Sequence, residues 1–132
     1  MGVHRLDKAD LPTEATSNKE EMMMYFEQLA TGRRLEILSD MLYKKREIRG
    51  FCHLYDGQEA IAFGCEAGMT REDAVITAYR NHCQALARGD TTYTILAEMM
   101  GKATGTHGGK GGSMHYYNKK ANYYGGNGIV GA

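Results

Sequence analysis

Two residues with phosphate-binding chemistry follow the most strand-like segment of this sequence. Residues 74–78 (AVITA) form a short apolar, β-branched run, which is typical of a buried strand. Tyr79 and Arg80 come directly after it. Ligands of open α/β sheets gather at the carboxyl ends of strands, where a guanidinium and a phenol could clamp a phosphate. The plainer alternative is a surface arginine beside a half-buried tyrosine.

A glycine-rich tail is the second candidate for anion chemistry. Residues 101–132 carry four lysines, no acid and ten of the seventeen glycines. Residues 126–131 read G-x-G-x-x-G. A dinucleotide site requires an apolar strand before this motif and a helix and an acidic residue after it, and the sequence shows none of these. Glycine N–H groups could approach an anion closely here. A flexible loop explains the composition equally well.

Charge and composition exclude several other classes of protein. The zero net charge of the 132 residues hides sixteen acids against twelve bases in residues 1–100. Balanced charge argues against general nucleic-acid binding, and the short apolar runs exclude a membrane-spanning helix. The three cysteines lack metal-ligand spacing, so we expect free thiols and no metal site. Ser113 has no nucleophile motif and Lys110 is out of frame for a P-loop.

The elements that must position these residues are mainly helical. Overlapping capping boxes at Ser17 and Asn18 predict a long helix that runs to about Ile48 and is closed by Gly50. Further helices are expected to end at Gly68 and to cover 81–88 and 92–100, with a loop from Thr104 onward. The core stripe expected on the long helix consists of Phe26, Leu29/Ala30, Ile37/Leu38 and Met41/Leu42, with Met22–Met24 as core filler.

One strand with several helices cannot form a sheet by itself. We therefore expect a truncated α/β domain, helix-rich because it is the N-terminal part of a parallel-sheet fold. The expected division is an irregular leader at 1–18 followed by an incomplete domain at 19–132.

Four segments in order resemble one enzyme family. They read IRGFCHLYDGQEA (48–60), ITAYRNH (76–82), GKGGSMH (109–115) and YGGNGIVGA (124–132). Together they are similar to the alpha subunit of the thiamine-diphosphate-dependent decarboxylating component of pyruvate dehydrogenase complexes, over about residues 19–132. The first segment favours the mitochondrial, eukaryotic version over the branched-chain 2-oxoacid and acetoin relatives.

The resemblance implies a fold, a reaction and roles for five residues. It implies a thiamine-diphosphate-binding α/β fold in an α2β2 assembly with a beta subunit, located in the mitochondrial matrix or, for a bacterial source, in the cytoplasm. Pyruvate would be decarboxylated and its acetyl unit passed to a lipoyl group of the acetyltransferase component, on the way to acetyl-CoA. By position, Tyr79 and Arg80 would hold the diphosphate, and His53 would be the catalytic residue near the substrate. Gly128 and Val130 would line the cofactor.

The sequence also departs from the family pattern. Residues 115–125 are longer than the family segment, so contacts near Asn118 do not transfer, and Ala132 precedes the GDG…N motif that binds magnesium diphosphate. We expect no metal ligand in this chain, and neither tight cofactor binding nor turnover by the chain alone. Two alternatives stay open: a non-catalytic truncated paralogue that binds another subunit, and the alpha subunit of another 2-oxoacid or acetoin dehydrogenase.

Overall fold

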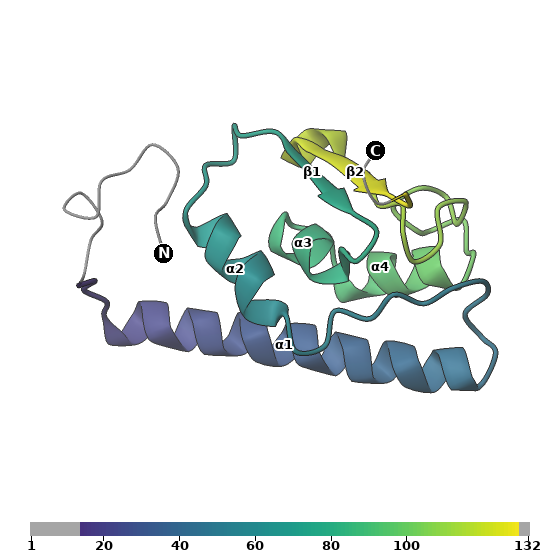
Figure 1. Cartoon of the computed structure of the whole chain (residues 1–132), viewed down its shortest axis with the longest axis horizontal. Helices are drawn as coiled ribbons and strands as arrows, with labels where there is room; N and C mark the ends of the chain where they lie inside the picture. Colours follow the sequence, from purple (N-terminus) through teal and green to yellow (C-terminus); the bar gives the residue numbers. More distant parts are fainter. Residues whose placement is uncertain (1–13, 130–132) are drawn as a thin grey trace.

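One long helix supports three short helices and a small parallel sheet (Figure 1). The computed structural model describes residues 14–129, so Val130 and most of the expected leader lie outside the described residues. The long helix α1 lies along the bottom of Figure 1 and the strands at the top, with the short helices between them. The elements are α1 (Lys19–Lys44), α2 (Glu59–Ala67), β1 (Val75–Ala78), α3 (His82–Ala87), α4 (Thr92–Met99), the 3₁₀ turn η2 (Lys119–Ala121) and β2 (Tyr123–Asn127).

The start of α1 was predicted correctly and its end was not. The Asn18 side chain accepts a hydrogen bond from the Glu21 N–H at 2.8 Å, as a capping residue does. The helix stops at Lys44, where Arg46 takes a left-handed φ of 62°. The Arg46 N–H then donates to the Tyr43 carbonyl and the Glu47 N–H to the Leu42 carbonyl, which closes the helix before Ile48 or Gly50.

The core face of α1 differs from the expected stripe. Leu29 and Leu42 pack on the core, but Phe26, Ile37, Leu38, Met41 and Met22–Met24 are exposed. The buried positions are instead Gly32, Leu35, Glu36 and Ser39. A Cβ atom at Gly32 would come within 3.0 Å of the Phe63 ring and 3.1 Å of the Cys83 sulfur. The missing side chain thus lets α1 lie against α2 and α3, and this contact chooses the buried face.

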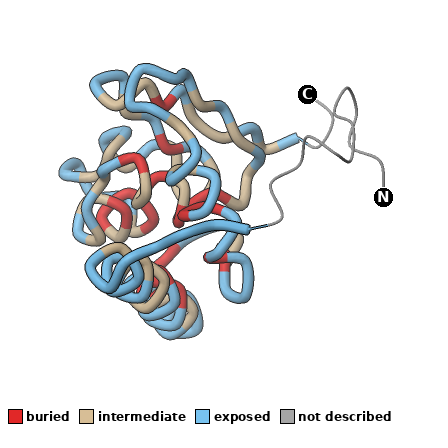
Figure 2. The backbone as a smooth tube through the Cα atoms, turned by 90° about the vertical axis from the view of Figure 1, so that its left-hand side faces the viewer, coloured by how far each residue is buried: buried red, intermediate tan, exposed pale blue. Residues whose placement is uncertain are grey.

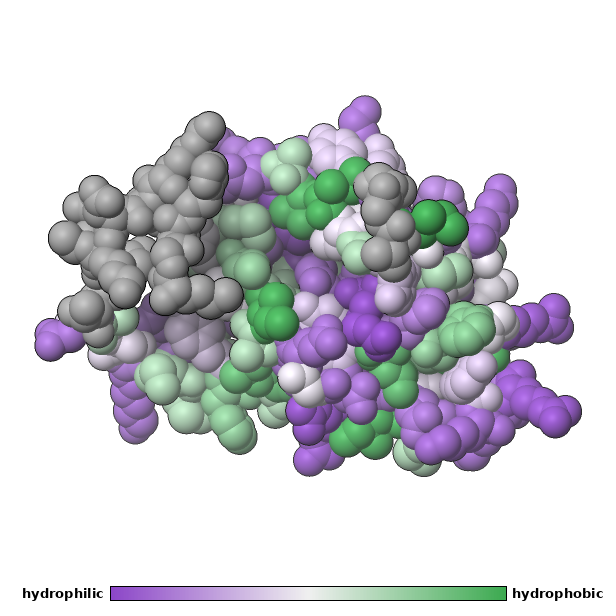
Figure 3. Space-filling view, in the orientation of Figure 1, coloured by the Kyte–Doolittle hydropathy of each residue, from purple (hydrophilic) through white to green (hydrophobic). Residues whose placement is uncertain are grey.

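The buried residues form two adjoining clusters. One contains Leu35, Ile48, Ala85, Ile95, Met99, Tyr116 and Tyr123, and the other contains Tyr55, Ala62, Phe63 and Cys83. Figure 2 shows them at the centre, where the helices meet. Figure 3 shows hydrophobic side chains exposed among hydrophilic ones over α1. No helix among residues 14–129 is long and apolar enough to cross a membrane.

The sheet has one strand that was predicted and one that was missed. β1 pairs in parallel with β2, with Val75 opposite Tyr123 and Ala78 opposite Asn127. β2 reads YYGGN, and its two glycines carry no strand signal, so pairing with β1 makes it a strand. The expectation of loop throughout 104–132 was wrong here, whereas the α/β class with a parallel sheet is confirmed. The division at residue 18 stays a prediction.

Candidate functional site

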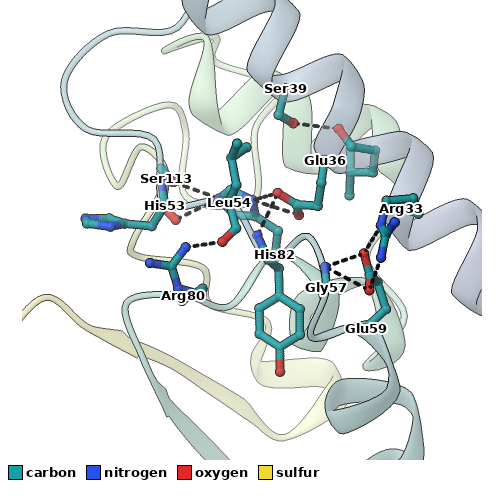
Figure 4. A network of polar contacts seen from close by, with 12 residues as sticks. Arg33, Glu36, Ser39, His53, Leu54, Gly57, Glu59, Arg80, His82 and Ser113 are labelled. Carbon is teal, nitrogen blue, oxygen red and sulfur yellow. Dashed lines mark hydrogen bonds and ion pairs between the residues drawn. The ribbon is translucent and has the colours of Figure 1, made fainter.

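Three of the predicted site residues, His53, Tyr79 and Arg80, come together at the end of β1. Figure 4 shows two of them, His53 and Arg80. The rings of His53 and Tyr79 lie 4.5 Å apart, and the Phe51 ring stacks on His53 at 5.1 Å. The Arg80 guanidinium lies 5.9 Å from the centre of the Tyr79 ring and donates a hydrogen bond to the Leu54 carbonyl. Residues from the loop after α1 and from the strand end therefore form one cluster.

The electrostatics of this cluster suit an anion. Among residues 14–129, Arg80 makes no ion pair with a carboxylate. Burial lowers the pKa of His53, and the positive charge of Arg80 and the nearby His82 lower it further. The His53 imidazole is thus neutral at pH 7 and free to accept or donate a proton. A guanidinium without an acid, beside a phenol and a neutral imidazole, fits the diphosphate end of a cofactor.

Gly128 lies at the same edge of the sheet as Tyr79. Ala78 pairs with Asn127 in parallel strands, so the residues that follow them leave the sheet at one end. A Cβ atom at Gly128 would meet the His115 ring at 3.5 Å. Its contact with a cofactor stays a prediction, as does that of Val130, which is outside the described residues.

A buried polar network beside this cluster was not predicted (Figure 4). His82 Nδ1 lies 2.9 Å from both carboxylate oxygens of Glu36, and His82 Nε2 lies 2.7 Å from Ser113 Oγ. Ser113 Oγ accepts a hydrogen bond from the His53 N–H at 2.9 Å, and Glu36 accepts one from the Tyr55 N–H at 3.0 Å. Glu36 and His82 are fully buried and Ser113 is 2% exposed. The one sequence signal that could have indicated this network is Glu36, an acidic residue among the buried positions of α1.

The glycine-rich tail binds an anion that belongs to the chain itself. The buried Glu98 carboxylate of α4 accepts three hydrogen bonds, from the N–H groups of His107 at 2.7 Å, Gly109 at 2.9 Å and Gly111 at 2.6 Å. The glycine N–H groups singled out from the sequence were those of residues 126–131. In the stretch 107–111 the anion is Glu98, so these three N–H groups are not available to a diphosphate.

Among residues 14–129, no three His, Cys, Asp or Glu side chains gather into a group that could hold a metal ion. Cys52, Cys65 and Cys83 are free thiols, as predicted. Burial raises the pKa of Cys52 to about 11. This thiol is therefore protonated at neutral pH.

The parallel sheet and the helix-rich packing define an α/β protein. The sequence model of the family described as "Dehydrogenase E1 component" matches residues 27–132. The chain belongs to this family, whose members generally depend on thiamine diphosphate.

Curated relatives give a more particular similarity. The chain is 56% identical over 90% of its length to "Pyruvate dehydrogenase E1 component subunit alpha-1, mitochondrial" of Oryza sativa subsp. japonica, of which it covers 30%. It is 54% identical over 98% of its length to the mitochondrial E1 alpha subunit of Sminthopsis macroura, covering 35% of it. It is 51% identical to the mitochondrial E1 alpha subunit of Solanum tuberosum, over 98% of its own length and 32% of the length of that subunit. The chain thus spans about a third of the length of these relatives.

Proposed function

We propose that this chain is part of the alpha subunit of a pyruvate dehydrogenase first component, and that it forms one wall of the thiamine-diphosphate site. The cluster of His53, Tyr79 and Arg80 carries the proposal, because residues from two segments converge without any acid beside Arg80. The similarity to the named alpha subunits supports pyruvate as the substrate. The reaction is decarboxylation of pyruvate with transfer of the acetyl unit to lipoamide.

Each residue has a distinct task in this proposal. Bound thiamine diphosphate supplies the carbanion-stabilising chemistry that decarboxylation of a 2-oxo acid needs. Arg80 and Tyr79 would hold the diphosphate by hydrogen bonds that are both charge-assisted, because the acceptor is an anion. His53, the catalytic residue, holds or moves a proton on its neutral imidazole at the substrate end. The backbone of Gly128 and Val130 lines the cofactor, and the magnesium ligands lie outside this chain.

The proposal extends to partners and location. A beta subunit supplies the opposite wall in an α2β2 assembly, and the lipoyl-bearing acetyltransferase component accepts the product. The mitochondrial names of the relatives favour the mitochondrial matrix.

A second candidate function is a non-catalytic subunit-binding module. The observation that favours it is the exposed apolar side of α1, where Phe26 is 65%, Ile37 53% and Met41 50% exposed. Co-purification of the 132-residue chain with a beta subunit, without any cofactor in the complex, is the result that this candidate predicts.

Calorimetry with thiamine diphosphate and magnesium tests the cofactor site. In the full-length subunit assembled with its beta subunit, Arg80→Gln should weaken cofactor binding by about 10- to 100-fold, because one hydrogen bond to a charged group is worth about 1.5–3 kcal/mol. Arg34→Gln, an exposed arginine on α1, is the matched control and should leave the affinity unchanged. Unchanged affinity in Arg80→Gln would refute the diphosphate role. The 132-residue chain alone should show no micromolar binding.

A further inference from the structure

The network of Glu36, His82 and Ser113 connects parts of the chain that are distant in sequence. Glu36 comes from the middle of α1, His82 from the start of α3, and Ser113 from the loop after α4. The network ends on two backbone N–H groups of a single segment, those of Tyr55 and His53. Buried polar groups of this kind are costly unless every member is paired, so the network specifies one arrangement.

The chemistry of the network is not that of a nucleophile. A carboxylate, an imidazole and a hydroxyl in this order can activate a serine. Ser113 is only 2% exposed, however, and its oxygen already accepts from the His53 N–H. The hydroxyl is therefore almost entirely covered and already engaged on both sides, by His82 and by the His53 N–H. The hydroxyl instead joins the imidazole of His82 to the backbone of His53.

The segment held in this way carries the candidate site. The His53 backbone is bound to Ser113, while its side chain leaves toward the rings of Phe51 and Tyr79. The next carbonyl in the chain, that of Leu54, accepts from Arg80. Among residues 14–129, Ser113 is the only residue whose side chain forms a hydrogen bond with the His53 main chain.

We propose that Ser113, held by His82 and Glu36, is a positioning residue that fixes His53 against Tyr79 and beside Arg80. Its importance for turnover rests on the proposed function, because His53 matters only if this cluster is the active site. The geometric role does not rest on it. Loss of the Ser113 hydroxyl removes the acceptor of the His53 N–H, so the segment moves toward water and away from the Arg80 charge.

Nuclear magnetic resonance of the histidine-labelled 132-residue chain tests this positioning role. We expect Ser113→Ala to abolish the cross-peak between the His53 and Tyr79 rings. We also expect it to raise the pKa of His53 toward the ordinary value of histidine, because the burial and the Arg80 charge that lower it are both reduced. The groups that face His53 are Tyr79, Arg80 and His82, and none of them is changed. Ser113→Thr retains the hydroxyl and should restore both signals.

Ser39→Ala is the matched control, because Ser39 is also a buried serine but donates only to the Leu35 carbonyl of its own helix. It should leave the His53 signals unchanged. If Ser113→Ala does not fold, Glu36→Gln provides the test, since it retains the side-chain volume but turns an amide N–H₂ toward His82 or Tyr55. Unchanged His53 signals in the folded variant, or an equal change in Ser39→Ala, would overturn the proposal.

The two proposals fail separately. The resonance measurement needs no cofactor, so a negative result removes the positioning role and leaves the cofactor site standing. Absence of thiamine diphosphate binding by the full-length assembled subunit removes the proposed function and leaves the resonance result unaffected.

Discussion

Glu36 and Glu98 are two fully buried carboxylates that stabilise the chain in different ways. Glu98 binds only N–H groups, and all of them lie within thirteen residues of it in the following loop. Glu36 binds one imidazole and one N–H, which lie 46 and 19 residues away. The first carboxylate shapes one loop, whereas the second joins separate parts of the fold.

The difference shows which buried charges can be inferred from sequence. A glycine-rich loop just after an acid is a local pattern, and the tail that contains this loop was expected to meet an anion, although Glu98 was not recognised as that anion. The pairing of Glu36 with His82 is a tertiary contact between α1 and α3, and no local sequence pattern predicts it. The local carboxylate supports the loop, and the distant one supports the candidate site.

The largest effect is expected from Glu98→Ala. This change removes a buried carboxylate and leaves three partly buried N–H groups without their acceptor, at about 1–2 kcal/mol each, so we expect a loss of about 3–5 kcal/mol in the free energy of unfolding. Urea denaturation measures it, and hydrogen exchange should accelerate at His107, Gly109 and Gly111. Glu98→Gln is the milder companion, because its remaining oxygen still accepts. A loss below about 1 kcal/mol would show that the carboxylate does not organise the loop.

Glu36→Ala is expected to lower the free energy of unfolding by somewhat less, but to affect parts of the chain that are more distant in sequence. Two buried partners lose their acceptor, which corresponds to about 2–4 kcal/mol. Hydrogen exchange should accelerate at Tyr55 and His53, far from α1 in sequence. Glu27→Ala, an exposed acid on the same helix, is the control and should change stability by no more than about 0.5 kcal/mol. Exchange confined to α1 would contradict the long-range role.

Two adjacent glycines of the loop allow the effect of close packing to be measured separately from the effect of the backbone angle. Gly108 and Gly109 both have left-handed φ angles, of 66° and 75°. A Cβ atom at Gly109 would come within 2.4 Å of the Gly101 carbonyl carbon, whereas one at Gly108 meets nothing within 4 Å. We expect Gly108→Ala to cost about 1–2 kcal/mol from the angle alone and Gly109→Ala at least about 1 kcal/mol more. Thermal unfolding of the two variants is the measurement, and equal losses would contradict close packing.

The smallest effect is expected from Glu59, a carboxylate that has a basic partner. The Arg33 hydrogen bond and N–H donors lower the pKa of Glu59 to about 2. Because this pKa lies below the ordinary value of 4.5, ionised Glu59 stabilises the fold at neutral pH. The contribution falls as the pH is lowered from about 4.5 toward 2. Arg33→Gln should weaken this acid dependence in a series of denaturation curves, and identical curves would rule out the pairing.

Local signals predicted part of the fold well. The Asn18 cap and the strand before Tyr79 are each determined by residues a few positions apart. Arg46 shows the limit of such signals, because a glycine was expected to end α1 and an arginine does so. Hydrophobic spacing alone placed Leu29 and Leu42 correctly but also put exposed residues such as Phe26 in the core, since it ignored the absence of a side chain at Gly32.

The sequence by itself determined the types of residue that could meet an anion, the helical character and, through four ordered segments, the family. Only the tertiary structure decided which of these residues meet. It joined His53 to Tyr79 and Arg80, paired Glu36 with His82, and paired β2 with β1. The physical reason is that a buried charge or an unpaired strand is stabilised by partners distant in sequence, which no local pattern contains.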